Sequence, residues 1–513
     1  MPFSLLPSIY AESSIPSLED WKGLWDSWDL VTRSMLPGEE LLEKPIRLRH
    51  ACIFYLGHIP AFLDIQLSKT TGEPLTEPAW YKTIFERGID PDVDNPERCH
   101  DHSEIPSEWP PSEDIMTYQS RVRSKLEDIY VQNEAQASRR VGRAIWVGFE
   151  HELMHIETLL YMMLQSDKTL PPPIAPQPDF AQLAKNAVAE RVNNEWFTIP
   201  QQLLTIGLDD REDEVDPARH YGWDNERPSR QVNVHSFQAK GRPITNEEYA
   251  RFVYNTQIGK LPVSWSQDAR IASTSNGETH GRTNGHTRNS AHDARDGPLP
   301  QSFLKGKSVK TVYGPIPLEY ALDWPVFASY DELSACAAWM GGRIPTFEET
   351  RSIYHHASVL KKKEAERTLG KTVPAVNSHL INNGVQETPP ATPPSEVNEE
   401  YQQDIFIDLD GANVGFQHWH PLPVTGGGNK LAGQAELGGV WEWTSSVLEK
   451  YDGFEPLSLY PGYTADFFDG KHNIVLGGSW ATHPRIAGRR TFVNWYQRNY
   501  LYAWAGARLV RDI

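Results

Sequence analysis

Apolar residues recur at helical spacing through much of the first 165 residues. In residues 18–36, tryptophans and leucines return every three or four positions, and residues 46–67, 112–135 and 144–165 show comparable patterns. This spacing gathers apolar side chains on one face of a helix. Helices with one apolar face each can share a core, so the pattern predicts a four-helix bundle.

The pattern changes beyond this region. Residues 166–193 open with SDKTLPPPIAPQPDF, whose prolines exclude regular helix and predict a linker. From residue 194 onward, short runs such as WFTIP, LLTIGL and RQVNVHSFQA predict strands between turns, and NEEYARFVYN and SYDELSACAAWM predict short helices. Two polar insertions, 264–298 and 387–404, are expected to be a long loop and a disordered segment. The expected fold class is α+β, with a helical bundle in 1–165 and a loop-rich domain in 194–513.

The fourth predicted helix contains the segment HELMHIE, whose histidines and carboxylates are candidate metal-binding or catalytic residues. On a helix, His151 and His155 lie about 40° apart on one face, so two imidazoles can grip one metal ion. Glu157 points roughly 240° away from His151 and is a poor third ligand. As H-E-x-x-H the segment suggests a zinc peptidase with Glu152 as general base. As H-x-x-x-H-x-E it resembles the second metal motif of iron-dependent sulfoxide synthases. A third interpretation is a buried helix whose histidines only form hydrogen bonds.

A third histidine lies in the second predicted helix. His58 sits in the apolar segment YLGHIPAF, with aromatic residues one turn before it. Pro60 is expected to kink or interrupt the helix there, which leaves the direction of His58 open. A histidine on such a stripe is either a hydrogen-bonded core residue or a further metal ligand.

Composition narrows the class of partner. The 513 residues contain 49 Lys and Arg against 68 Asp and Glu, a net charge of −19 that argues against nucleic acid or an anionic membrane. No apolar run approaches 18 residues, and the N-terminus lacks a secretory pattern. Three scattered cysteines suggest neither disulfides nor a cysteine zinc site. We therefore expect a cytoplasmic protein.

The second part of the chain resembles a known domain. GWDNERPSRQVNVHSF, ITNEEYARFV, GGRIPTFEETRS, GGVWEWTSS, GGSW and GARLVRD occur in the order of the signature blocks of the formylglycine-generating-enzyme (sulfatase-modifying factor) domain. That domain is a variant of the C-type-lectin fold. Formylglycine-generating enzymes proper use paired copper-binding cysteines near the C-terminus. No cysteine follows Cys336 here, so that activity is not expected.

The whole arrangement resembles the iron-dependent sulfoxide synthases of the ergothioneine pathway, in which a DinB-like four-helix bundle with H-x-x-x-H-x-E is fused to this domain. YLGHIPAF and FEHELMHIE resemble the family's two metal segments, and HELMHIETLLYMMLQ before a Pro-rich linker resembles the fungal branch. Fungal members usually carry an N-terminal histidine methyltransferase domain, so we expect a dissected core or a stand-alone synthase. Hercynine (trimethylhistidine) would then come from a methyltransferase domain or partner. A longer zincin motif would need Gly and His where Thr158 and Tyr161 stand, which disfavours the peptidase.

The resemblance implies a reaction and a metal. Fe(II) held by His58, His151 and His155 would keep three adjacent positions for a thiol, an imidazole substrate and O2. The implied reaction joins the thiol to an imidazole carbon of a histidine derivative and oxygenates the sulfur to a sulfoxide. An ovothiol-type synthase that accepts plain histidine and an inactive ligand-binding module remain as alternatives.

The resemblance also assigns substrate-binding residues in the second domain. In YPGYTADFF, Tyr460 matches the catalytic proton-donating tyrosine and Tyr463 a contact to the imidazole substrate. Asn494 and Trp495 match residues that hold the amino-acid end of that substrate, and a Trp face suits a quaternary ammonium. Met154 stands where bacterial members have a glutamine, which departs from the family pattern.

The expected thiol is free cysteine. Bacterial synthases that use γ-glutamylcysteine carry an Asp and an Arg where this chain has Tyr496 and Tyr500. Two phenols in place of two charges remove ion-pair partners and shrink the pocket. An unpaired buried carboxylate would then cost roughly 1–3 kcal/mol, or about 10–100-fold in discrimination. The competing possibility is that Arg498 binds this carboxylate.

Overall fold

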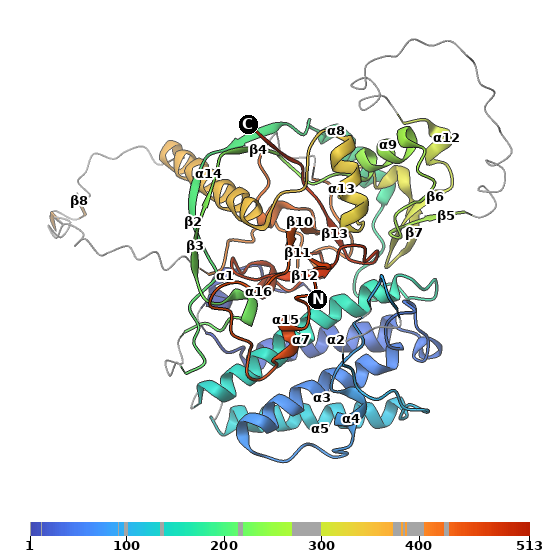
Figure 1. Ribbon diagram of the computed structural model, residues 1–513, viewed down its shortest axis with the longest axis vertical. Helices are drawn as coiled ribbons and strands as arrows, with labels where there is room; N and C mark the ends of the chain where they lie inside the picture. Colours follow the sequence, from blue (N-terminus) through green and yellow to red (C-terminus); the bar gives the residue numbers. More distant parts are fainter. Residues whose placement is uncertain are drawn as a thin grey trace, which may run out of the picture.

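The computed structural model has two parts that pack against each other (Figure 1). Helices from the first third of the chain, blue to cyan, form the lower part, and strands with further helices form the upper part. The structure describes the whole chain except residues 1, 12, 91, 97–100, 134–137, 214–218, 269–298, 373–380, 383–384, 387–404 and 425–429.

The lower part is helical, as the apolar pattern predicts. Its described elements are α1 (Pro7–Ala11), α2 (Leu18–Leu30), the π-helical turn Val31–Met35, the 3-10 turn Gly38–Glu40, α3 (Cys52–Thr71), α4 (Tyr81–Phe85), α5 (Ser112–Val131) and α7 (Arg139–Met163). A capping box of Ser17 and Asp20 starts α2, and the Ser138 side chain caps α7. The tryptophans at helical spacing, among them Trp21 and Trp28, are fully buried between the helices.

Local details of these helices differ from the sequence prediction. The second helix begins at Cys52 instead of residue 46 and continues through Pro60, although a kink or break was expected there. The residues around Pro60 are buried, and their packing keeps the helix continuous across the missing N–H. The helix α5 begins at Ser112 as predicted, with Pro111 at the cap position, but it ends at Val131 instead of residue 135.

The predicted linker 166–193 is only partly irregular. Residues 166–179 contain no helix or strand, but α8 (Phe180–Glu190) follows them, started by the Asp179 side chain, which accepts from the Gln182 N–H. Phe180 is buried against Trp324 of the upper part, with ring centroids 5.8 Å apart. This segment therefore packs as part of the fold.

The upper part is built on small sheets joined by loops and helices. A four-stranded sheet in the order β12-β11-β10-β13 lies at its centre, and β1, β4 and β14 bring the chain's end beside residues 196–240. Its strands are β1 (Trp196–Ile199), β2 (Gln202–Ile206), β3 (Arg230–Val234), β4 (Phe237–Lys240), β5 (Trp265–Gln267), β6 (Lys307–Thr311), β7 (Gly314–Pro317), β8 (Ile381–Asn382), β9 (Val385–Gln386), β10 (Trp441–Val447), β11 (His472–Gly477), β12 (Asn494–Gln497), β13 (Ala505–Gly506) and β14 (Val510–Asp512). Its helices after α8 are α9 (Asn246–Thr256), α12 (Gln301–Leu304), α13 (Tyr330–Trp339), α14 (Phe347–Thr372), α15 (Gly462–Ala465) and α16 (Pro484–Ala487).

Two features of this part correct the sequence prediction. The insertion expected at 264–298 begins with β5, because Trp265 is buried and pairs with Val309 of β6. The remainder of that insertion from residue 269, and all of 387–404, lie outside the described residues. The 26-residue helix α14 was not predicted in this domain, which was expected to be loop-rich. Buried tryptophans of this part, including Trp441 and Trp480, do supply much of its core.

Buried ion pairs join α7 to the upper part. Both carboxylate oxygens of Glu150 accept hydrogen bonds from the Arg489 guanidinium, which also binds Glu226 at 2.9 Å. Near the start of α7, Asp210 accepts from Arg143 at 2.6 Å. Because these groups are fully buried and paired, they fix the orientation of α7 relative to the sheets. In the described part of the chain, no helix is both long and apolar enough to cross a membrane.

Candidate metal centre and substrate pocket

Three histidines converge between α3 and α7. His58 comes from α3, and His151 and His155 come from adjacent turns of α7. One ring nitrogen of each lies within 4.8 Å of the others, and the two Nε2 atoms of the α7 pair are 3.1 Å apart. Neighbouring nitrogen ligands with metal bonds of about 2.1 Å lie roughly 3.0 Å apart. This cluster therefore has the spacing of a metal site.

The rings of the cluster are held by their surroundings. The Nδ1 atom of His58 lies 2.6 Å from the carbonyl oxygen of Phe85, the last residue of α4. An Nδ1–H that donates to this carbonyl leaves the Nε2 lone pair for a metal. Phe54 stacks on His58 with centroids 4.9 Å apart, and Phe62 stacks on His151 at 3.7 Å. Aromatic packing and one backbone contact thus orient the donors.

Burial keeps the three imidazoles neutral. It lowers the pKa of His58 to about 4, although the hydrogen bond to Phe85 acts in the opposite direction. Burial and neighbouring imidazoles hold the pKa of His151 well below its usual range, and burial with nearby His58 and Arg49 does the same for His155. Neutral imidazole is the form that binds a metal, so near pH 7 the cluster needs no deprotonation.

The two carboxylates of the motif face away from the ligand positions. Glu157 accepts from Trp441 Nε1 at 2.7 Å and from the Thr482 hydroxyl at 2.6 Å, so it links α7 to the upper part. Glu152 is buried on the side of Arg123, where burial raises its pKa to about 7, and it does not line the cavity. The arrangement gives no support to Glu152 as the base of a peptidase.

A cavity of about 190 Å³ extends from the histidines to the upper part. This size suits small molecules more than a protein segment. The sequence-predicted site residues all line this one cavity: His58, His151, His155, Met154, Tyr460, Tyr463, Asn494, Trp495, Tyr496 and Tyr500. Tertiary packing thus brings together residues from α3, α7, β12 and the segment that contains α15.

Tyr460 and Tyr463 form one side of the cavity. Tyr460 packs on Phe62 with centroids 5.3 Å apart, and Phe62 in turn stacks on His151. Burial and nearby Asp90 raise the pKa of the Tyr460 phenol, so it keeps its proton near neutral pH. Tyr463 is stacked on a buried tryptophan, and its hydroxyl lies 3.8 Å from the Met154 sulfur.

Trp495 and the two tyrosines that follow it continue the lining of the cavity. Trp495 meets the Tyr463 ring edge to face at 5.0 Å, and its neighbour Asn494 accepts from the Trp495 backbone N–H. Tyr496 and Tyr500 lie with parallel rings whose centroids are 6.0 Å apart. This part of the cavity lining is aromatic.

Arg498 lies elsewhere, whereas an arginine that sequence reasoning missed lines the cavity. Arg498 pairs with Asp331 at 2.7 Å, is half exposed, and does not line the cavity. Arg49 lies in the turn before α3, and its Nε donates to the Tyr500 hydroxyl at 2.8 Å. Asp90 also lines the cavity and was missed. Neither residue belongs to a periodic pattern, so no local signal pointed to them.

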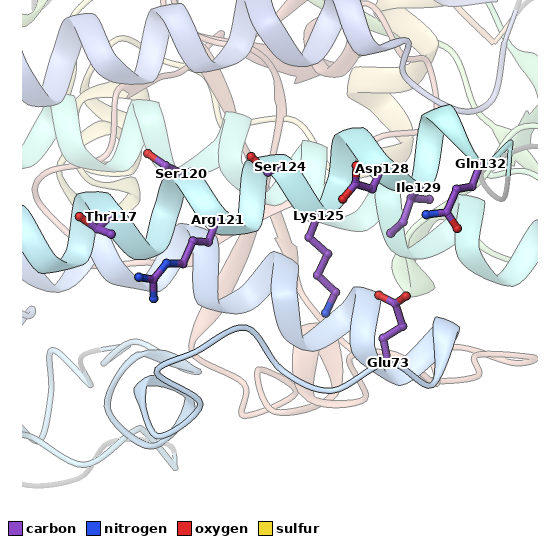
Figure 2. A pocket seen from close by; sticks show the side chains of 9 residues that line it. All are labelled: Glu73, Thr117, Ser120, Arg121, Ser124, Lys125, Asp128, Ile129 and Gln132. Atoms are coloured by element: carbon purple, nitrogen blue, oxygen red, sulfur yellow. The ribbon is translucent and has the colours of Figure 1, made fainter.

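A second hollow runs along α5, on the bundle, and it carries no comparable chemistry. Figure 2 shows Lys125 reaching from α5 toward the end of α3, near Glu73. The ammonium group of Lys125 is occupied by Asp64, Ser68 and the Pro74 carbonyl, at 2.8–3.0 Å. This hollow is therefore interpreted as solvated surface where α5 packs on α3.

Comparison with known proteins agrees with this architecture. Residues 189–513, more than half of the chain, match the sulfatase-modifying factor enzyme 1-like domain. The chain belongs to this family of C-type-lectin-like domains. The α+β class and the identity of the second domain are thereby confirmed.

Individual relatives cover the bundle as well. Ergothioneine biosynthesis protein 1 of Neurospora crassa is 65% identical over all of this chain, which spans 60% of that relative. The protein of the same name from Schizosaccharomyces pombe is 33% identical over 97% of this chain, which spans 56% of it. A hercynine oxygenase of Mycobacterium tuberculosis is 30% identical over 56% of this chain and of itself. These similarities confirm the resemblance to fungal ergothioneine-pathway proteins, although the chain spans little more than half the length of the fungal relatives.

Proposed function

We propose that this protein is an Fe(II)- and O2-dependent sulfoxide synthase of ergothioneine synthesis, which joins cysteine to the imidazole of hercynine. One observation carries the proposal. Three neutral histidines, two buried and one partly buried, line a small cavity together with Tyr460 and Trp495 from the second domain. The names of the relatives, ergothioneine biosynthesis protein and hercynine oxygenase, support the same pathway.

The donor set fits iron in this role. His58, His151 and His155 would hold the metal through three neutral nitrogens, without a carboxylate, because Glu157 is bound to Trp441 and Thr482. Imidazole suits iron, and a three-ligand set keeps positions open for substrates. Bound Fe(II) would supply the binding and activation of O2 and hold both substrates near it.

The residues around the metal have separate tasks in this proposal. The Tyr460 phenol holds its proton close to the histidines and can deliver it to a reacting oxygen. The Trp495 face suits the trimethylammonium group of hercynine, and Tyr463 would contact its imidazole. Holding both substrates in one cavity reduces the entropic part of the barrier.

The overall reaction balances without another reductant. A C–S bond forms at the imidazole carbon, one atom of O2 ends on the sulfur, and the other leaves as water. The hydrogens of that water come from the thiol and from the imidazole C–H. Four electrons pass from the two substrates to O2.

Further assignments belong to the same proposal. Residues 1–165 are inferred to be a DinB-like bundle, residues 166–193 an inter-domain segment, and residues 194–513 the catalytic partner domain. A cytoplasmic location is proposed, with hercynine supplied by a methyltransferase domain or partner and with no nucleic acid or membrane as partner.

Aerobic turnover tests the proposal directly. The Fe(II)-loaded chain is incubated with hercynine and cysteine, and the products are identified by mass spectrometry. A product with the mass of both substrates plus one oxygen, less two hydrogens, is expected. Parallel reactions replace hercynine by histidine, or iron by zinc with a peptide substrate. Absence of the sulfoxide with every thiol offered, despite full iron loading, would overturn the proposal.

A further inference from the structure

Arg49 places a fixed positive charge in the cavity. Its Nε donates to the Tyr500 hydroxyl, and its guanidinium carbon lies 5.2 Å from the Tyr500 ring centroid and 5.7 Å from that of Tyr161. The side chain is only 12% exposed. A guanidinium stays charged at any physiological pH, so this part of the cavity is cationic whenever it is open to a ligand.

Among the described residues around the cavity, the ion pair of Arg49 is a loose one. The carboxylate nearest to Arg49 is that of Asp90, 3.8 Å from Nη1, which is too long for a hydrogen bond. The other arginines nearby are occupied: Arg87 binds Asp466 at 2.5 Å, and Arg498 binds Asp331 outside the cavity. Unlike Arg87 and Arg498, Arg49 lines the cavity and has a carboxylate partner without a hydrogen bond to it.

Asp90 adds the opposite charge at the same place. Its side chain is 39% exposed and lines the cavity together with Arg49. A cation and an anion side by side match a free α-amino acid, which carries a carboxylate and an ammonium on one carbon. A planar guanidinium binds a carboxylate through two parallel hydrogen bonds, and a carboxylate accepts from an ammonium.

We propose that Arg49 and Asp90 form an anchor for the zwitterionic end of the free amino-acid thiol, with Arg49 on its α-carboxylate and Asp90 on its α-ammonium. The inference rests on the proposed function and names how that site selects its thiol. In this proposal Arg49 binds the substrate carboxylate, the role considered for Arg498 from the sequence. Arg498 is paired with Asp331 instead.

The anchor also explains discrimination against γ-glutamylcysteine. In that dipeptide the cysteine nitrogen is an uncharged amide, so Asp90 would lose its ionic partner. The added γ-glutamyl group would also meet the parallel rings of Tyr496 and Tyr500. We therefore expect free cysteine to bind more tightly than the dipeptide by about 10–100-fold.

Anaerobic calorimetry on the Fe(II)-loaded full chain tests the anchor without requiring turnover. The ligands are cysteine, cysteamine, which lacks the carboxylate, and 3-mercaptopropionate, which lacks the ammonium. Arg49→Met should raise the Kd of cysteine by about 10–100-fold and leave that of cysteamine nearly unchanged. Asp90→Asn should raise the Kd of cysteine by a smaller factor, because Asp90 is more exposed, and leave that of 3-mercaptopropionate nearly unchanged.

Controls separate the anchor from a folding or metal defect. Arg498→Met removes the same charge outside the cavity and should bind all three thiols like the parent. Iron content and circular dichroism confirm that each variant is folded and loaded, and Asp90→Asn keeps the test open if Arg49→Met fails to fold. Equal losses for cysteine and cysteamine in Arg49→Met, or a cysteine affinity unchanged in both variants, would overturn the anchor. If the parent binds cysteine as expected but forms no sulfoxide, the proposed function fails while the anchor stands.

Discussion

At the scale of single residues, the decisive property of the cluster is burial without charge. The three histidines are neutral because a buried imidazolium would be poorly solvated, and neutral nitrogens are the groups that bind a metal. Contacts to Phe85, Phe54 and Phe62 set the ring directions. Protein contacts therefore orient the rings of His58 and His151.

The ligand assignment can be tested by metal content. His58→Ala, His151→Ala and His155→Ala should each lose nearly all bound iron, since two remaining imidazoles form an incomplete site. Glu157→Gln serves as the control and should keep most of the iron, because this side chain binds Trp441 and Thr482. Full iron occupancy in the His58 variant, measured by elemental analysis, would contradict the assignment.

A second residue-scale prediction concerns Tyr460. Tyr460→Phe removes one hydroxyl and keeps the ring that packs on Phe62, so the variant should fold and load iron like the parent. Loss of a positioned proton donor costs about 100- to 10,000-fold in rate. We expect sulfoxide formation to fall within that range and oxidised thiol to increase. Product analysis that shows the parent's rate and product ratio would rule out a chemical role for this phenol.

At the scale of elements, the close packing of α3 against α4 positions His58. A Cβ atom on Gly57 would lie 2.5 Å from the Cε1 atom of Phe85, whose carbonyl orients His58. The aromatic ring is buried and cannot move freely, so a methyl group there must displace α4 or tilt α3. Gly57 therefore allows the close packing of α3 on α4, and this packing places the Phe85 carbonyl beside His58.

Gly57→Ala should therefore weaken metal binding although alanine favours a helix. Overpacking of this kind costs about 1–3 kcal/mol, more than the roughly 1 kcal/mol that alanine contributes in a helix. The expected result is a lower midpoint of thermal unfolding and a lower iron affinity. Gly23→Ala in α2 is the matched control, because its Cβ would meet only Phe3, at 3.8 Å. Equal iron affinity in both variants would show that α4 tolerates the displacement.

At the scale of the whole molecule, α7 belongs to both parts. It carries two of the histidines on one side and Glu150 and Glu157 on the side that faces the sheets. The cavity needs this shared helix, since the histidines and the aromatic residues come from parts far apart in the sequence. The buried ionic network around Arg489 is what holds the two parts in register.

Arg489→Met should weaken that connection strongly. It removes the ion-pair partner of the buried Glu226 and leaves Glu150 with only the longer pair to Arg485, at 3.7 Å. Breaking a buried pair of this kind costs about 3–5 kcal/mol. Arg498→Met breaks an exposed pair and should cost less than about 1 kcal/mol. Denaturant unfolding of both variants measures the difference. Similar stability of the two variants would show that the network contributes little.

Sequence by itself determined the helices of the first part, the identity of the second domain and the residues now seen around one cavity. These follow from local causes: periodic apolar positions, a two-histidine helical spacing and ordered signature segments. The course of α3 through Pro60, α8 within the expected linker and β5 within the expected insertion departed from prediction, because packing overrode the local signal.

Tertiary structure alone decided what meets at the cavity. It directed His58 toward the α7 pair and turned Glu157 toward Trp441. It also placed Arg498 outside the cavity, paired with Asp331. It also brought Arg49 and Asp90 together, 41 positions apart by their numbers and on no shared element. The physical reason is that side-chain direction and charge pairing across elements depend on contacts between distant segments, which residue spacing along one helix or strand does not specify.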